Sequence, residues 1–174
     1  MATPKQQQYP SSKIFVGAVL YIAMAWTDDD GKTTSEIEQW VVRSIRAKRG
    51  SKTKYGFKVA ASRAYDVAQY VNLTQKIDRI TWGKRSTKNG DYGWLSSIPE
   101  SFRMQFRVGD PLPYGLYTTE RAALVYRIAA EKEWLAKVKL RDDALEIETA
   151  EAELSALKRR LARLKPKQPK TING

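Results

Sequence analysis

The chain has 174 residues, enough for one domain or two small ones, and 42% of them are hydrophobic. It carries 31 Lys and Arg against 19 Asp and Glu, and the net charge of +12 favours nucleic acid, an anionic membrane surface or an acidic protein as partner. The absence of both Cys and His excludes disulfides, zinc fingers, thiol nucleophiles, Ser-His-Asp triads and HNH nucleases.

The N-terminal part begins with a polar segment, residues 1–12, that we expect to be a flexible arm. It has no signal-peptide pattern. The apolar run 14–26 has 13 residues, whereas a membrane-spanning helix needs about 20. We therefore expect a buried strand or core helix here and no membrane partner.

A hairpin turn is predicted at 27–34, "TDDDGKTT", because Asp-Gly flanked by polar residues is a strong turn signal. The segment 35–48 after it fits either a helix, with Ser35 and Glu38 as a capping box, or the partner strand of the hairpin. We favour the strand, because residues 14–22 are rich in β-formers and need a partner. The turn is no EF-hand loop, because Trp26 and Ile37 occupy the positions that require acids.

The middle of the chain is basic and shows a faint internal repeat. A basic loop at 46–56 carries five cations: Arg46, Lys48, Arg49, Lys52 and Lys54. A short helix is expected at 60–72, a strand at 76–86 and a second hairpin turn at Asn89-Gly90. Because 54–71 is similar to 113–130, we expect an N-terminal α+β half, 13–72, and a second half, 73–138, each a small antiparallel sheet on one helix.

The segment 102–108, "FRMQFRV", alternates polar and apolar residues and so predicts a half-buried strand. Arg103, Gln105 and Arg107 share its wet face, with the two arginines about 13 Å apart. Arg binds phosphate or guanine, and Gln pairs with adenine. The same residues also suit a merely solvated face. Flanking contacts are expected from Lys84, Arg85, Lys88 and Trp94.

The stretch "YGLYTTERAALVYRIAA" at 114–130 resembles the closing segment of the AP2 DNA-binding domain. The resemblance is carried by a Gly, an aromatic residue and a Thr, followed by a helix with two Ala pairs around a Tyr: Gly115, Tyr117, Thr119, Ala122, Ala123, Tyr126, Ala129 and Ala130. It implies that residues 92–132 form a three-stranded sheet on one helix, with 102–108 among the DNA-reading strands. The step from Thr to the first Ala pair is one residue short, and "DYGWLSS" lacks the Arg-Gly-Val-Arg pattern of the family's first strand.

The C-terminal part predicts one long helix from Thr119 to Leu164, or two helices with a kink, because no Gly or Pro interrupts it. A heptad seam over 139–164, with one fault at Asp143, predicts a coiled-coil-like surface. Its members are Leu140, Ile147, Leu154, Leu157, Leu161 and Leu164. The seam packs either on its own domain or on a partner. The acid-to-base gradient along it favours an antiparallel homodimer. Residues 165–174 form a basic tail.

Together these patterns predict an α+β protein with small antiparallel sheets, each packed on a helix, followed by a long C-terminal helix. The function expected is non-enzymatic binding of nucleic acid, double-stranded DNA rather than RNA, by a regulatory or architectural protein of a phage or mobile element. We expect no cofactor or metal, and a cytoplasmic or nucleoid location. The alternative is a protein–protein interaction module, such as a phage-encoded inhibitor or assembly subunit that docks on an acidic partner.

Overall fold

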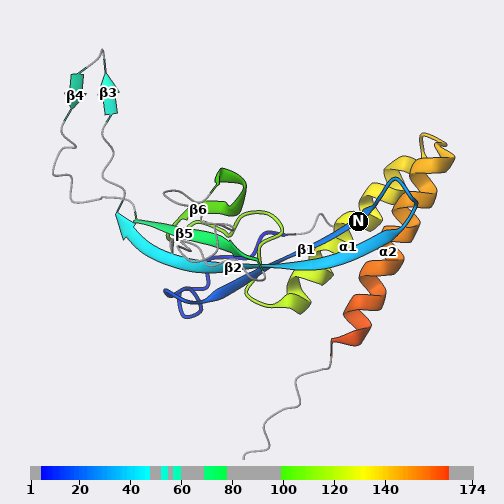
Figure 1. Cartoon of the computed structure of the whole chain (residues 1–174), viewed down its shortest axis with the longest axis horizontal. Coiled ribbons are helices and arrows are strands. Elements are labelled where there is room, and N and C mark those ends of the chain that lie inside the picture. Colours follow the sequence, from blue (N-terminus) through cyan, green and yellow to red (C-terminus); the bar gives the residue numbers. More distant parts are fainter. Residues whose placement is uncertain (1–4, 48–51, 55–56, 60–68, 78–98, 165–174) are drawn as a thin grey trace, which may run out of the picture. The chain divides into compact units, whose positions relative to one another are not determined.

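The computed structural model describes residues 5–47, 52–54, 57–59, 69–77 and 99–164 (Figure 1). The chain divides into two compact units. The helical unit comprises Met1–Lys5, Ile22–Ile37 and Thr119–Gly174, and the sheet unit comprises Gln6–Tyr21 and Glu38–Thr118. The two longest strands, β1 (Val19–Thr27) and β2 (Thr33–Ala47), contribute residues to both units.

The fold is of the α+β class, as the sequence predicts. The remaining elements are β3 (Lys52–Lys54), β4 (Phe57–Val59), β5 (Gln69–Lys76), the short 3-10 helix η1 (Glu100–Phe102), β6 (Arg103–Arg107), α1 (Glu120–Lys139) and α2 (Ala144–Arg163). Four strands form one antiparallel sheet in the order β1-β2-β5-β6, and β3 pairs with β4 in a separate two-stranded sheet.

The predicted hairpin joins β1 to β2. Its turn is closed by Asp28, whose Oδ1 accepts the N–H of Lys32 at 2.8 Å, and Gly31 takes the positive φ of 74° that the turn requires. The hydroxyls of Thr27 and Thr33 lie 3.0 Å apart across the first pair of the hairpin. The preference for a strand at 35–47 is confirmed, because this segment pairs with β1 on one side and with β5 on the other.

The core of the sheet unit lies under one face of β2, β5 and β6. Val42 and Leu73 are opposite each other and buried, as are Val71 and Phe106. In each of these strands the residues between them point to the other face. A β-bulge interrupts this alternation in β2, between Val42 and Ser44.

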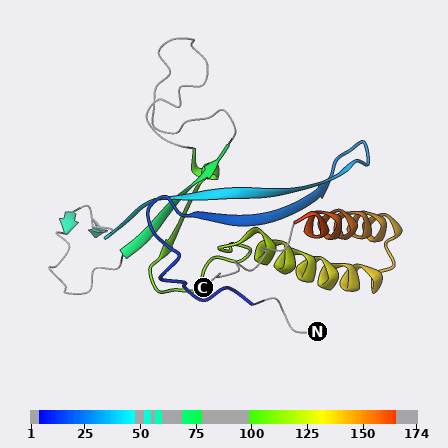
Figure 2. The same cartoon turned by 90° about the horizontal axis from the view of Figure 1, so that it is seen from below.

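The helical unit is built on the hairpin of α1 and α2, which run antiparallel side by side (Figures 1 and 2). Thr119 caps α1 by accepting the N–H of Ala122 at 3.2 Å, and Asp143 caps α2 by accepting the N–H of Glu146 at 3.0 Å. The apolar stripes of both helices are buried: Ala123, Leu124, Ile128 and Val138 on α1, and Ala150, Leu154, Ala156 and Leu157 on α2.

The start of β2 contacts α2 within the same unit. Ser35 donates its hydroxyl to the carbonyl of Ala156 at 3.5 Å, and Arg160 donates to the carbonyl of Ser35 at 2.8 Å. No helix in the described part of the chain is long and apolar enough to cross a membrane.

The long helix predicted from Thr119 to Leu164 is two helices, but they form an antiparallel hairpin and not the kinked pair that the sequence suggested. Residues 140–143 separate α1 from α2. Asp142 there adopts a positive φ of 57°, and Asp143 makes the cap. Asp tolerates this conformation because its short polar side chain can bond locally. The fault in the heptad at Asp143 therefore marks the turn, which needs neither Gly nor Pro.

Other predictions are wrong. Residues 69–72 belong to β5 and not to a helix, because Val71 alternates with polar neighbours and strand pairing on both sides outweighs helical spacing. The boundary predicted at 72/73 falls inside β5, so strands of both expected halves share one sheet. The strand predicted at 76–86 shares only Lys76 with β5. Residues 60–68, 78–98 and 165–174 lie outside the described residues.

The expectation of a flexible arm is also wrong where the segment 1–12 is described. The carbonyl of Gln7 accepts the N–H of Leu112 at 2.8 Å, and its Oε1 accepts the N–H of Thr118 at 3.1 Å. The ring of Tyr9 meets that of Phe106 edge to face, with centroids 6.4 Å apart. These contacts hold residues 7–9 against the sheet unit.

Candidate nucleic-acid interface

The polar face of the sheet unit is the side of β2, β5 and β6 opposite its core. We define it by nine residues: Arg43, Ser44 and Arg46 on β2; Tyr70, Asn72 and Thr74 on β5; Arg103, Gln105 and Arg107 on β6. Strand alternation places them there, because buried Val42, Val71, Leu73 and Phe106 occupy the intervening core positions.

Cross-strand pairing arranges the polar face in rows. One row is Arg46–Tyr70–Arg107, the central row is Ser44–Asn72–Gln105, and the last contains Thr74 and Arg103. Successive rows are about 6.6–6.8 Å apart along a strand, so arginines stand on both sides of the central row and about 13 Å from each other.

The β-bulge adds a fourth arginine to this face. Because β2 holds one extra residue between Val42 and Ser44, Arg43 points to the same side as Ser44. Its Nε donates to Oγ1 of Thr74 at 2.6 Å. This contact directs the guanidinium across β5 towards the row of Arg103.

Hydrogen bonds also connect the central row. Nε2 of Gln105 donates to Oδ1 of Asn72 at 2.6 Å. Nδ2 of Asn72 donates to Oγ of Ser44 at 3.2 Å and to the carbonyl of Tyr70 at 3.4 Å. The middle of the face is therefore an ordered strip of amides and a hydroxyl.

An open hollow of about 580 Å³ lies on the polar face. Its lining includes Arg43, Arg46 and Arg103, and Glu100 is the one carboxylate among the described residues that line it. Within the described ranges, none of the four arginines of the polar face forms an ion pair. The surrounding sequence is also basic, since the sheet unit has 16 Lys and Arg against 6 Asp and Glu, a net charge of +10. Among the described residues of this face, positive charge therefore exceeds negative charge.

The structure brings four of the predicted nucleic-acid-binding residues together: Arg46, Arg103, Gln105 and Arg107. Lys48, Arg49, Lys84, Arg85, Lys88 and Trp94 lie outside the described residues, and Lys52 and Lys54 belong to β3. Sequence reasoning missed Arg43, Ser44, Tyr70, Asn72 and Thr74. The alternation of "QYVNLT" at 69–74 was the signal that could have found the three on β5.

The predicted oligomerisation seam packs largely inside the chain. Leu154 and Leu157 are buried within the chain, so they offer little surface to a second chain in this structure. Ile147, Leu161 and Leu164 are partly exposed, and Leu140 is 88% exposed. Between α1 and α2, Lys139 meets Glu151 at 2.7 Å. The antiparallel homodimer stays a prediction.

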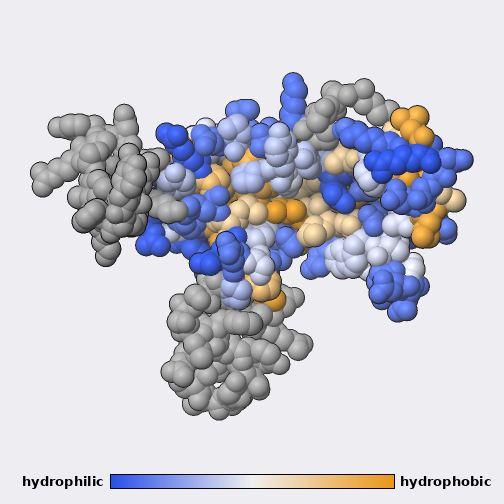
Figure 3. Space-filling model, turned by 90° about the horizontal axis from the view of Figure 1, so that it is seen from above, coloured by the Kyte–Doolittle hydropathy of each residue, from blue (hydrophilic) through white to orange (hydrophobic). Residues whose placement is uncertain are grey.

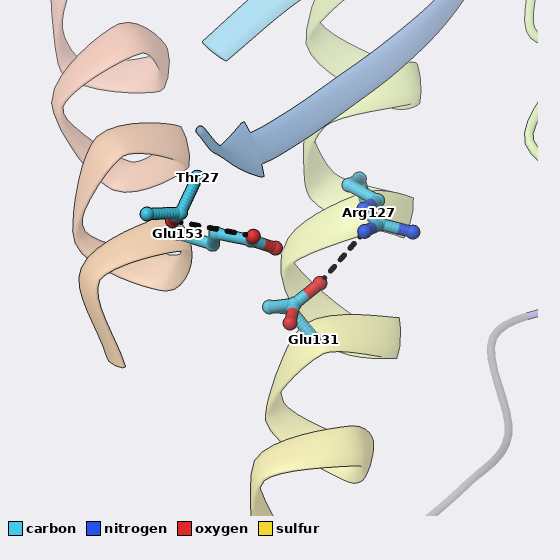
Figure 4. Close-up of polar contacts among 4 residues, drawn as sticks. All are labelled: Thr27, Arg127, Glu131 and Glu153. Atoms are coloured by element: carbon cyan, nitrogen blue, oxygen red, sulfur yellow. Dashed lines mark hydrogen bonds and ion pairs between the residues drawn. The ribbon is translucent and has the colours of Figure 1, made fainter. Parts of the chain in front are cut away.

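A second polar cluster lies in the helical unit, between α1, α2 and the end of β1 (Figure 4). Arg127 is 3.0 Å from buried Glu131, and the hydroxyl of Thr27 donates to Oε1 of Glu153 at 3.4 Å. Burial raises the pKa of Glu131, Arg127 partly offsets this, and Glu153 raises the pKa further. Burial also raises the pKa of Glu153, against the opposing effects of Arg127 and Thr27.

The two carboxylates of this cluster, Glu131 and Glu153, line a cavity of about 240 Å³ together with Trp134 and Leu145. The side chain of Arg141 lies over Trp134, 5.4 Å from the ring centroid. The described part of the chain contains no group of three or more acids that could hold a metal ion.

Comparison with protein-family models, with curated proteins and with solved structures finds no match to this chain. The resemblance to the AP2 domain is therefore neither supported nor opposed by these comparisons. The segment DYGWLSS at 91–97, which corresponds to the first strand of that domain, lies outside the described residues.

Proposed function

We propose that this protein binds double-stranded DNA through the polar face of its sheet unit. The observation that carries the proposal is the presence of four arginines, Arg43, Arg46, Arg103 and Arg107, on one face without an ion-pair partner in the described ranges. Guanidinium groups bind phosphates and guanine edges, and a net charge of +10 in the same unit favours a polyanion.

The dimensions of the face favour a duplex groove. Three strands spaced 4.7–4.9 Å apart are about 10 Å wide, and the major groove of B-DNA is about 12 Å wide. In this arrangement the arginines on either side of the central row reach the phosphates or outer base edges, while the amides of Asn72 and Gln105 face the groove floor. The proposed role is regulatory or architectural and requires no catalysis, and the proposed origin is a phage or mobile element.

Titration of labelled duplex DNA at low and moderate salt tests the proposal. We expect binding to weaken steeply with salt, since each neutralised phosphate releases a counterion. Arg103→Ala and Arg107→Ala should each cost about 1–3 kcal/mol of binding free energy if they meet base edges. If they meet phosphates, each should reduce the salt slope by about 1.

The matched control is Arg159→Ala, which removes the same charge from an exposed position on α2. It should change affinity less than either substitution on β6. Unchanged binding in the Arg103→Ala/Arg107→Ala double variant, or equal losses in the Arg159→Ala variant, would refute the polar face as the interface. Single-stranded RNA and an acidic protein serve as competitors, and stronger competition by either than by duplex DNA would change the assigned partner.

A second candidate function is self-association through the helical unit. Trp134, Leu140 and Leu145 expose 41%, 88% and 74% of their surface at the end of the helix hairpin. On the face drawn in Figure 3, apolar side chains interrupt an otherwise hydrophilic surface. We propose a second copy as the occupant. Leu145→Glu should then shift the mass measured by light scattering from that of a dimer to that of a monomer. A monomeric mass for the unsubstituted protein would contradict the proposed self-association.

A further inference from the structure

The amide orientation of Asn72 is fixed by its surroundings. A backbone carbonyl only accepts hydrogen bonds, so the contact of 3.4 Å to the carbonyl of Tyr70 requires the Nδ2 of Asn72 on that side. Its Oδ1 then faces β6, where it accepts from Nε2 of Gln105 at 2.6 Å. The orientation of Gln105 follows from that of Asn72.

This chain of bonds decides what Gln105 offers to a ligand. One of its two N–H groups is used by Asn72, which leaves one N–H donor and the Oε1 acceptor. Within the described residues, no hydrogen bond to Oε1 is formed. The side chain is exposed and lines the hollow of the polar face. Gln105 therefore presents one donor beside one acceptor.

Among the four bases, adenine matches this pattern in the major groove. Adenine shows an N7 acceptor next to an N6–H donor, whereas guanine shows two acceptors, N7 and O6. A free glutamine could turn both N–H groups towards guanine, but here Asn72 already holds one of them. Oε1 of Gln105 would then face an acceptor of guanine, without a hydrogen atom between them.

We infer that Gln105 is the base-reading residue of the polar face and selects adenine, with Asn72 as the residue that positions it. This inference rests on the proposed binding of double-stranded DNA. The arginines on either side supply attraction and register, because phosphate contacts carry no sequence information. Discrimination of about tenfold for adenine over guanine at one position is expected from a bidentate amide–adenine pair.

Selection from a library of randomised DNA duplexes tests the inference. The unsubstituted protein should retain a pool enriched in adenine at one position of the site. Gln105→Ala should still retain duplexes, with the same steep salt dependence, but without that enrichment. Asn72→Ala, which frees the second N–H of Gln105, should reduce the preference for adenine over guanine while leaving adenine tolerated.

The control is Gln69→Ala, an exposed glutamine of β5 that alternation places on the other face. It should keep the full enrichment. A retained pool with no enriched adenine, or an enrichment that persists in Gln105→Ala, would overturn the inference and leave the proposed function intact. Failure of the unsubstituted protein to retain any duplex at low salt would instead reject the proposed function.

Discussion

The carboxyl group of Glu131 is buried, although glutamate side chains are mostly exposed. Its side chain is 4% exposed and has Arg127 as its ion-pair partner. Nε of Arg127 is itself buried without a hydrogen-bond partner in the described residues. Burial and the nearby Glu153 together outweigh Arg127, so the pKa of Glu131 lies above its ordinary value of 4.5.

This raised pKa predicts a pH dependence of stability. Between the ordinary pKa and the raised one, folded Glu131 binds more protons than unfolded Glu131, so the free energy of unfolding falls as pH rises through that window. The contribution is fully present below pH 4.5 and is lost above the folded pKa. Urea unfolding over a series of pH values should show this decline, and Glu131→Gln should flatten it.

The control for this prediction is Glu133→Gln, because Glu133 lies on the same helix with an exposed side chain paired to Lys137. It should leave the decline in place. Equal flattening by both substitutions would show that the pH dependence does not come from the buried cluster.

Some residues of the polar face could be predicted from the sequence, and others could not. Arg103, Gln105 and Arg107 could be placed on one face, because alternation within a strand is local information. Asn72 and Thr74 could not be assigned to the same face from the sequence, because this requires knowing that β5 pairs with β6. That pairing brings together residues about 30 positions apart. Arg43 joins the face through a bulge, which breaks the alternation on which such predictions depend.

At the scale of elements, the two-helix form depends on the cap at Asp143. Its Oδ1 accepts the N–H of Glu146, one of the groups that a helix N-terminus leaves unpaired. Asp143→Ala should therefore lower the free energy of unfolding by about 0.5–2 kcal/mol in urea titrations. Asp143→Asn keeps an acceptor and should cost much less. A similar loss in both variants would show that the cap is not the source.

Packing between α1 and α2 predicts a larger effect. Leu157 is fully buried, so Leu157→Ala should cost about 2–5 kcal/mol of unfolding free energy, from lost transfer energy and the cavity left behind. Val125→Ala truncates an exposed apolar side chain of α1 and should stay within about 0.5 kcal/mol of the unsubstituted protein. A small effect at Leu157 would mean that the hairpin contributes little to stability.

Sequence predicted the elements best where the signal was local. The Asp-Gly turn, the strand at 103–107 and the long helical stretch all follow from short patterns. The heptad seam was also present, but heptad spacing does not say what the seam packs against. Here α2 runs back along α1, and Leu154 and Leu157 are buried within the chain. Only the three-dimensional structure decides between this packing and pairing with a second chain.

At the scale of the whole molecule, the two units share their two longest strands. Because β1 and β2 contribute residues to both units, neither unit can lose its strands without disturbing the other. We predict a single cooperative thermal transition, with a calorimetric enthalpy equal to the van't Hoff enthalpy. Leu157→Ala should lower the midpoint of that transition without splitting it. Two separate transitions would show that the units unfold independently.

Most of the net positive charge belongs to the sheet unit, which carries the proposed DNA-binding face. The sheet unit has a net charge of +10, and the remaining +2 of the total belongs to the helical unit, where acids nearly balance bases. Net charge alone predicted a polyanionic partner for the protein. The sequence could not show how this charge divides between the units. Residues 22–37 and 119–174 belong to the same unit although a long stretch of chain separates them.

Because Arg43 is the extra residue of the β-bulge, deletion of this one residue would change the charge of the polar face. Deletion of Arg43 would leave Val42 on the core face, Ser44 on the polar face and Ile45 on the core face. This is the alternation of a regular β-strand. A one-residue deletion at this place would thus subtract one cation while every apolar side chain keeps its side of the sheet. Elsewhere in the same strand, an equal deletion would turn the following side chains over.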